Sequence, residues 1–172
     1  KKQLINLRLL ITRNGLKRGE YLKKKKVFKY FGDNVWYQPY KIPTQPYLVK
    51  IGNNVKIATE VIFLEHDVIH SLLNTKYNTH MYKEKLGTIE IGDNTFIGGR
   101  TTILYNVKIG KNCLIEAGSV VTKDIPDNSV AAGVNCRVIG NIEKIEKNMK
   151  EYSEKLKNVN ILKDLNAEYE IQ

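Results

Sequence analysis

The chain contains three histidines, and all three fall within one short stretch: His66, His70 and His80. An imidazole group ordinarily titrates near neutral pH, so it can accept a proton under physiological conditions, and it is also a common zinc ligand. Two chemical interpretations are therefore open, namely proton transfer by one histidine or metal binding by three that converge. A purely structural role is the alternative for each histidine. The choice depends on the elements that hold this stretch in place.

Those elements repeat every six residues. From Ile91 to Pro126 the chain reads as the hexads IGDNTF, IGGRTT, ILYNVK, IGKNCL, IEAGSV and VTKDIP. A helix would repeat near 3.6 residues and a strand at two, so neither explains this period. A period of six is typical of a chain that makes one flat face per hexad and then turns, so that stacked coils form a parallel β-helix. The aliphatic first positions are predicted to point inward, and the mostly small or β-branched fifth positions to fit near the corners.

The same repeat appears upstream, in residues 51–62 and once more in residues 31–36. The spacing from Phe63 to Ile91 is not a multiple of six, so we predict a loop that leaves the coil at residues 67–88. Long insertions in repeat proteins lie on one face and often carry function. His66 immediately precedes this loop, and the other two histidines lie in it.

Both ends of the chain are predicted to be helical. We expect an N-terminal helical cap over residues 1–30, a parallel β-helix over residues 31–139, and a C-terminal helix and tail over residues 140–172. The cap is expected to cover the open first coil, because an exposed terminal coil is an aggregation-prone edge. In the C-terminal segment, apolar residues spaced by three and four predict a stripe that packs on the coil or on a neighbouring subunit. These residues are Ile142, Ile145, Met149, Tyr152 and Leu156.

The chain is basic and contains two cysteines. It has 28 Lys and Arg against 18 Asp and Glu, a formal net charge of +10, which suits an anionic partner such as a nucleotide-bearing cofactor, a polyanionic glycan or a membrane surface. No nucleic-acid-binding motif is present, so nucleic acid is not an expected partner. Cys113 and Cys136 do not make a disulfide framework, and we expect a cytoplasmic location. No apolar run approaches the length that spans a bilayer, so membrane contact is not required.

Three segments carry a resemblance to a known family: FLEHDVIH at residues 63–70, IGDNTFIGGRTTI at 91–103 and LIEAGSVVTKDIPDNSVAAGV at 114–134. Together they resemble the hexapeptide-repeat acyltransferases, in particular the galactoside and maltose O-acetyltransferase branch. The pair Thr122-Lys123 is the most specific piece. The resemblance implies a left-handed parallel β-helix, a homotrimer with sites between subunits, and acetyl-CoA as co-substrate without a metal.

The resemblance also implies roles for individual residues. His66 would be the general base that removes the proton of an acceptor hydroxyl as its oxygen attacks the thioester. The backbone N–H of Gly99 would stabilise the negative charge that develops on the carbonyl oxygen. Cationic side chains suit the phosphates of CoA. The implied CoA-binding residues are Gly99, Ala117, Thr122, Lys123 and Arg137.

The loop is the segment expected to bind the acceptor, and a sugar hydroxyl in surface-polysaccharide biosynthesis is the predicted target. Aromatic side chains can stack on a sugar ring. The candidate acceptor-binding residues are His70, Tyr77, Tyr82 and Trp36.

What orients His66 is left open, because Glu65 and Asp67 point to the other side of an extended segment and Glu116 is a weak candidate.

Some positions depart from the family pattern. Asn135 stands where a proline is usual, Gly140 where many relatives have a second basic residue, and Phe96 where a tryptophan is usual. These changes bear on CoA affinity and acceptor identity and remove no catalytic group.

Alternative functions stay open. The same fold could acetylate an amino-sugar nitrogen or transfer another acyl group. A zinc carbonic anhydrase-like enzyme would need all three histidines to converge, and a non-catalytic scaffold would not bind CoA.

Overall fold

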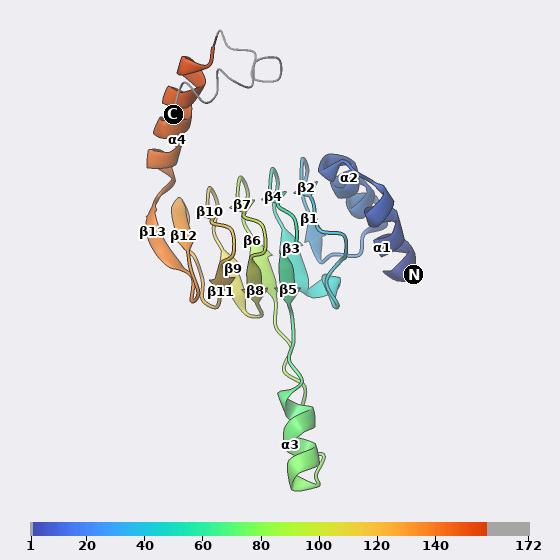
Figure 1. The fold of residues 1–172 in the computed structure, drawn as a ribbon. Helices are drawn as coiled ribbons and strands as arrows, with labels where there is room; N and C mark the ends of the chain where they lie inside the picture. The colour runs from blue at the N-terminus through green and yellow to red at the C-terminus, as the bar shows by residue number, and fades with distance from the viewer. Residues whose placement is uncertain (1, 158–172) are drawn as a thin grey trace.

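Three β-sheets make up the body of the protein (Figure 1). The computed structural model describes residues 2–157. The first sheet contains β1 (Tyr30–Phe31), β3 (Val49–Ile51), β6 (Ile89–Ile91) and β9 (Val107–Ile109). The second contains β2 (Trp36–Tyr37), β4 (Lys56–Ile57), β7 (Phe96–Ile97), β10 (Leu114–Ile115), β12 (Ser129–Ala132) and β13 (Arg137–Asn141). The third contains β5 (Ile62–Leu64), β8 (Thr102–Leu104) and β11 (Val120–Val121).

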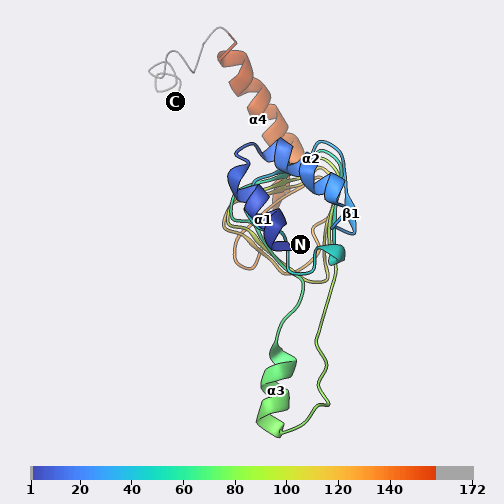
Figure 2. The same ribbon diagram turned by 90° about the vertical axis from the view of Figure 1, so that its right-hand side faces the viewer.

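Successive strands of the chain visit the three sheets in turn. β6, β7 and β8 lie in the first, second and third sheet, and β9, β10 and β11 repeat this order. Neighbouring strands pair in parallel, for example Ile57 with Ile97 and Ile97 with Ile115. The chain therefore winds as a three-sided coil, which Figure 2 views along its length. β13 departs from this pattern because it pairs antiparallel with β12.

The inward positions of the hexads form the core, as the sequence predicts. All first-position residues are buried: Ile91, Ile97, Ile103, Ile109, Ile115 and Val121. All fifth-position residues are buried as well: Thr95, Thr101, Val107, Cys113, Ser119 and Ile125. Both predictions are confirmed. Burial also raises the pKa of the Cys113 thiol above its ordinary value.

A column of asparagine side chains runs along the corner between the first and second sheets. Each amide Nδ2 donates to the Oδ1 of the next asparagine at 2.9–3.1 Å. Each residue has a positive φ, a conformation that asparagine tolerates better than most residues. The column therefore combines turn geometry with coil-to-coil bonding. Its members are Asn34, Asn54, Asn94, Asn112 and Asn128.

Replacing a central member of this column should weaken the coil. Asn94→Ala is expected to lower the free energy of unfolding by about 1–2 kcal/mol, because it removes two amide hydrogen bonds and places alanine at φ 56°. Urea denaturation at fixed protein concentration measures the change. Asn94→Gly is the matched variant, since glycine adopts positive φ freely and loses only the side-chain bonds. An alanine variant as stable as the natural chain would contradict the expectation.

Two helices lie across the first coil, α1 (Lys2–Ile11) and α2 (Gly15–Lys25) (Figure 2). The Asn14 side chain caps α2 by accepting from the N–H groups of Leu16 and Lys17. The guanidinium of Arg18, which is 2% exposed, donates to the carbonyl oxygens of Thr12 and Gln38. The hydrogen bond from this buried guanidinium to Gln38 holds α2 against the segment that follows β2.

The predicted loop after His66 contains a helix, α3 (Ile69–Tyr77), and projects from the coil (Figure 1). We call residues 67–86 the extension. Asp67 Oδ1 accepts the N–H of Ile69 at 3.0 Å, which helps to start the helix. Every residue of α3 has solvent exposure, so the coil does not cover the helix.

The remaining helices are the 3₁₀ helix at Pro46–Leu48 and α4 (Ile142–Lys155). α4 leads away from the last coil (Figure 1), because β13 carries the chain back along β12 before the helix begins. Within the stripe, Met149 is exposed, whereas Leu156 at the end of the helix is buried. Packing of the stripe on a neighbouring subunit stays a prediction. Among the described helices, none is long and apolar enough to cross a membrane.

Candidate functional site

His66 lies where the extension leaves the coil. β5 ends at Leu64, and the backbone of His66 forms an antiparallel bridge with Leu86, where the chain returns. The N–H of Gly87 donates to the carbonyl of Glu65 at 2.9 Å, which closes the base of the extension. The imidazole Nδ1 is buried and has no hydrogen-bond partner among residues 2–157. The backbone of His66 is therefore fixed, and its buried Nδ1 has no hydrogen-bond partner within the described part of one copy.

The two carboxylates beside His66 are engaged elsewhere. Glu65 is buried, and its Oε1 accepts the N–H of Gln45 at 2.9 Å. Asp67 Oδ2 accepts the hydroxyl of Tyr105 at 2.8 Å. The hydrogen bonds from the Ile69 N–H and then from Tyr105 hold the pKa of Asp67 below its ordinary value. Neither carboxylate bonds to the His66 ring in the structure, in agreement with the alternation expected of an extended segment.

Glu116 does not approach His66 either. It follows β10 at the corner between the second and third sheets, whereas His66 lies at the corner between the third and the first. No described residue orients the imidazole through Nδ1.

A hollow of about 230 Å³ lies at the base of the extension, next to His66 in the chain. Two of the predicted acceptor-binding residues, His70 and Tyr82, line it. Tyr77 does not line the hollow, but its ring centre lies 6.2 Å from that of Tyr82. The remaining lining residues are Asp67, Ile69, Leu73, Lys83, Lys85 and Tyr105.

Trp36 lies away from these residues within one chain. It belongs to β2 in the second sheet, and its indole lies against Gly15 at the start of α2. The extension leaves from the corner opposite this sheet, between the third and first sheets. One copy of the chain therefore does not bring Trp36 to the extension.

Three of the predicted CoA-binding residues share a second hollow, of about 490 Å³. Thr122 and Lys123 follow β11, and Arg137 opens β13, so the fold brings together positions that lie 14 or more residues apart. Val134, Asn135 and Cys136 complete the lining, and the Cys136 N–H donates to the carbonyl of Val120. Two cationic side chains at one hollow can bind phosphate groups.

Gly99 and Ala117 lie on successive coils at the corner between the second and third sheets. The Gly118 N–H donates to the carbonyl of Gly99 at 2.8 Å. No described residue accepts a hydrogen bond from the N–H of Gly99, so this donor is available to a ligand. His66 and Gly99 lie at opposite ends of the third sheet in one copy.

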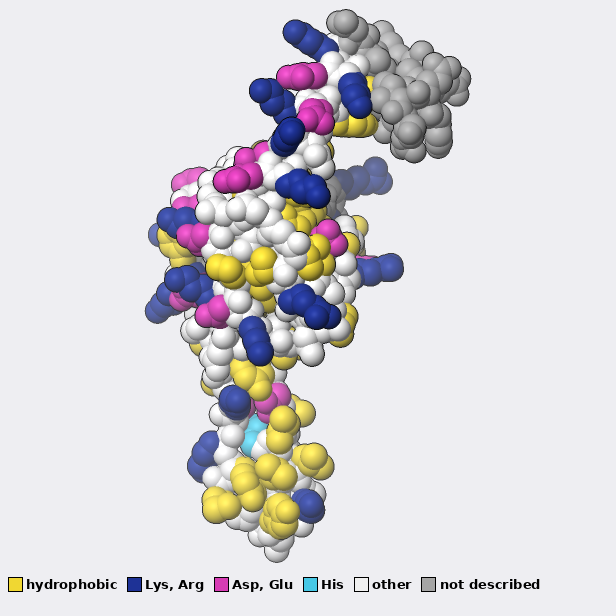
Figure 3. Space-filling view, turned by 90° about the vertical axis from the view of Figure 1, so that its left-hand side faces the viewer, with side chains coloured by type: hydrophobic (Ala, Val, Ile, Leu, Met, Phe, Trp, Pro, Cys, Tyr) yellow, Lys and Arg dark blue, Asp and Glu magenta, His cyan; other side chains and the backbone are white. Residues whose placement is uncertain are grey.

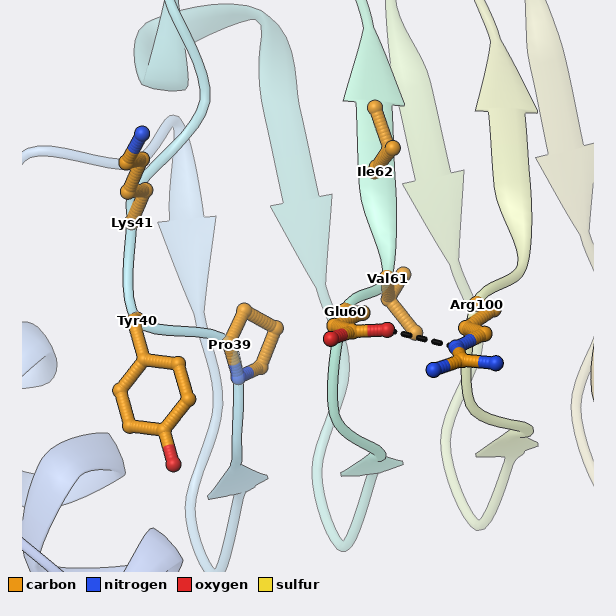
Figure 4. A pocket seen from close by; sticks show the side chains of 7 residues that line it. All are labelled: Pro39, Tyr40, Lys41, Glu60, Val61, Ile62 and Arg100. Atoms are coloured by element: carbon orange, nitrogen blue, oxygen red, sulfur yellow. Dashed lines mark hydrogen bonds and ion pairs between the residues drawn. The ribbon is translucent and has the colours of Figure 1, made fainter.

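Next to Gly99, a hollow of about 420 Å³ opens on the outer side of the third sheet (Figure 4). Tyr40 and Pro39 lie on one side and Ile62 on the other, so much of the lining is apolar. The Nε of Arg100 pairs with Oε2 of Glu60 at 2.7 Å across two coils. Sequence reasoning did not single out this hollow.

Sequence reasoning also missed Tyr105, Lys83 and Lys85 as parts of the site. Tyr105 could have been found by aligning the hexads of successive coils. Leu64 pairs with Leu104, so the residues that follow Leu104 must lie near His66. The lysines follow α3 on the returning part of the extension, where no repeat fixes their position. Among residues 2–157, no group of three His, Cys, Asp or Glu side chains could hold a metal ion.

Comparison with known proteins agrees with this architecture. Residues 88–123 match the family described as bacterial transferase hexapeptide (six repeats). The resemblance to hexapeptide-repeat acyltransferases and their galactoside and maltose branch is confirmed.

Individual relatives bear out the branch. The galactoside O-acetyltransferase of Escherichia coli (strain K12) is 48% identical over 103 residues, which are 59% of this chain and 48% of that protein. A maltose O-acetyltransferase structure from Clostridium difficile 630 has a TM-score of 0.61 and 28% identity, covering 81% of this chain and 83% of that one. A galactoside acetyltransferase in complex with coenzyme A has a TM-score of 0.58 and 29% identity, covering 85% and 81%. The chain spans about half the length of the curated relatives it matches.

Proposed function

We propose that this chain is an acetyl-CoA-dependent O-acetyltransferase that acts on a sugar hydroxyl in surface-polysaccharide biosynthesis. The observation that carries the proposal is the hollow shared by Thr122, Lys123 and Arg137, in which two cationic side chains lie together. The resemblance implies that these residues bind CoA, and a similar solved structure is a galactoside acetyltransferase in complex with coenzyme A, which supports a CoA-dependent function.

His66 would serve as the general base. The hydroxyl oxygen of the sugar forms a bond to the acetyl carbon while His66 takes the hydroxyl proton. The bond from that carbon to sulfur breaks, and its electron pair leaves with the CoA thiolate, which then takes up a proton. The N–H of Gly99 would donate to the carbonyl oxygen as negative charge develops there. This is direct transfer, without an acetylated protein side chain.

The placement of these groups supports a homotrimer with sites between subunits. In one copy, His66 and Gly99 are separated by a strand of the third sheet, and three extended residues span about 10 Å. The resemblance implies sites between subunits, so in this proposal His66 of one copy acts with Gly99 of another. The apolar hollow beside Gly99 offers surface for such contact.

We infer that the coil is a left-handed parallel β-helix over residues 31–139, flanked by a cap at 1–30 and a helix and tail at 140–172. The hand is inferred from the resemblance to the O-acetyltransferases. The cytoplasmic location stays a prediction.

Free-thiol release from acetyl-CoA tests the function against a panel of sugars, amino sugars, nucleotide sugars and oligosaccharides. Acceptor-dependent release with hydroxyl sugars supports O-acetylation, and release with amino sugars alone would support the N-acetyltransferase alternative. If no acceptor gives release, a CoA titration separates a missed acceptor from a non-catalytic scaffold.

The CoA hollow gives its own prediction. Arg137→Gln is expected to raise the KM for acetyl-CoA by about tenfold, because one charge-assisted phosphate contact is lost. Lys123→Gln should act in the same direction. Steady-state thiol release measures both, and Lys24→Gln on α2 is the matched control because it removes an exposed charge at the other end of the coil. An unchanged KM in both variants would reject the phosphate assignment.

A further inference from the structure

The hollow at the base of the extension is rich in positive charge. Lys83 and Lys85 line it together with His70, and one carboxylate, Asp67, faces them. Figure 3 shows the extension with basic side chains close to its apolar surface. The formally ionised groups at the hollow are therefore two lysines and one aspartate, before any proton on His70 is counted.

The one carboxylate is already satisfied. Asp67 accepts the N–H of Ile69 at 3.0 Å and the hydroxyl of Tyr105 at 2.8 Å, which uses both of its oxygens. The hydrogen bond from Tyr105 holds Asp67 next to the residue that follows β8. No lysine forms an ion pair with Asp67 in the described chain.

Both lysines retain donors for a ligand. Lys83 Nζ bonds only to a neutral oxygen, the carbonyl of His80 at 3.2 Å, among the described residues. Lys85 Nζ lies 5.2 Å from the centre of the Tyr105 ring and has no carboxylate partner within residues 2–157. A lysine ammonium has three donors, so each can still contact an oxyanion.

His70 lines the hollow beside the two lysines. Its Nδ1 is buried with no hydrogen-bond partner among the described residues. Ile69 and Leu73 provide an apolar wall beside it.

We propose that this hollow is an anion subsite, in which Lys83, Lys85 and His70 bind a phosphate or carboxylate group carried by the acceptor sugar. The inference rests on the proposed function, because it names the class of acceptor: an acidic sugar whose target hydroxyl lies beside its anionic group. His66 itself does not line the hollow, but its backbone lies at the same base of the extension, so a sugar anchored there by its anion would extend a neighbouring hydroxyl toward the general base.

Direct binding tests the subsite without acetyl-CoA. The full chain is titrated by calorimetry or NMR with methyl galactoside, galacturonic acid and galactose 6-phosphate. We expect the acidic sugars to bind about tenfold more tightly than the neutral one, as two partly exposed charge pairs allow. The Lys83→Gln/Lys85→Gln variant should lose this preference. Lys76→Gln is the matched control, because Lys76 lies on α3 outside the hollow and stacks on Tyr77.

The two acidic probes distinguish the sources of the anion. A preference for galactose 6-phosphate indicates a phosphorylated acceptor, and a preference for galacturonic acid indicates a uronic acid. Equal binding of neutral and acidic sugars would overturn the subsite, and so would absence of any binding, or a preference that persists in the double variant or is lost equally in Lys76→Gln.

This test and the proposed function fail separately. Lysine-dependent anion binding without acetyl transfer to any acceptor would reject the activity and keep the subsite. Acetyl transfer that prefers no acidic sugar and is unchanged by the double lysine substitution would keep the activity and reject the subsite. Thermal unfolding of each variant measures whether the lysine substitutions disturb the fold, and little change is expected because both side chains are exposed.

Discussion

Acetyl transfer by the His66→Ala variant should fall by roughly 100- to 10,000-fold, the range typical of a lost general base. A hydroxyl group is a weak nucleophile until its proton is removed, and alanine offers no acceptor for that proton. CoA binding should be unchanged, because the hollow that holds Thr122, Lys123 and Arg137 lies near the last coil. The expected signature is therefore a loss in kcat with little change in the KM for acetyl-CoA, measured by thiol release.

His80→Ala is the matched control for this experiment. It makes the same change on the same extension, and His80 is exposed and does not line the hollow beside His66. Activity of His80→Ala should stay within about twofold of the natural chain, since surface substitutions away from a site have small effects. Near-normal turnover by His66→Ala would remove the general-base assignment, and equal losses in both variants would indicate a disturbed extension instead.

The second large effect concerns the core of the coil. Ile103→Ala should lower the free energy of unfolding by about 3 kcal/mol, within the range for truncating a buried isoleucine. Ile103 is fully buried and lies between Phe63 and Val121 in the third sheet. Its removal leaves a cavity that neighbouring coils cannot fill, because their backbones are fixed by pairing on both sides.

Denaturant unfolding at constant protein concentration measures this effect, since association of copies would add to stability. Ile139→Ala is the control, because Ile139 is 57% exposed on β13 and loses little buried surface. Its change should stay within about 0.5 kcal/mol. Equal destabilisation by the two substitutions would show that the inward ladder does not supply the stability assigned to it.

The coil could be predicted because each hexad repeats the same pattern of residue types. Inward isoleucines such as Ile97 and small corner residues such as Thr95 recur at fixed spacing, so one correct hexad predicts the others. The extension was located by the break in this spacing, but its helix was not predicted. α3 is short and exposed, so its sequence has no buried stripe that would give a periodic signal.

The candidate site was predictable where it lies on the repeat and less so elsewhere. Thr122 and Lys123 follow from their place after a hexad, and Arg137 meets them because β13 turns back along β12. The hydrogen bond between Asp67 and Tyr105 joins residues that lie 38 positions apart, and a local sequence pattern does not indicate such a contact. The position of Lys85 likewise depends on how the extension returns to the coil.

The reversed direction of β13 also limits the size of the assembly that this fold can build. A parallel coil with open ends is a template onto which another copy could add, and repeated addition would produce a filament. At one end α1 and α2 block the template (Figure 2). At the other, β13 occupies the outer edge of β12 and runs against it, so a further coil cannot continue the parallel register of the second sheet. Continuation of the second sheet is thus blocked at both ends within each copy, which favours lateral association as the route to oligomers.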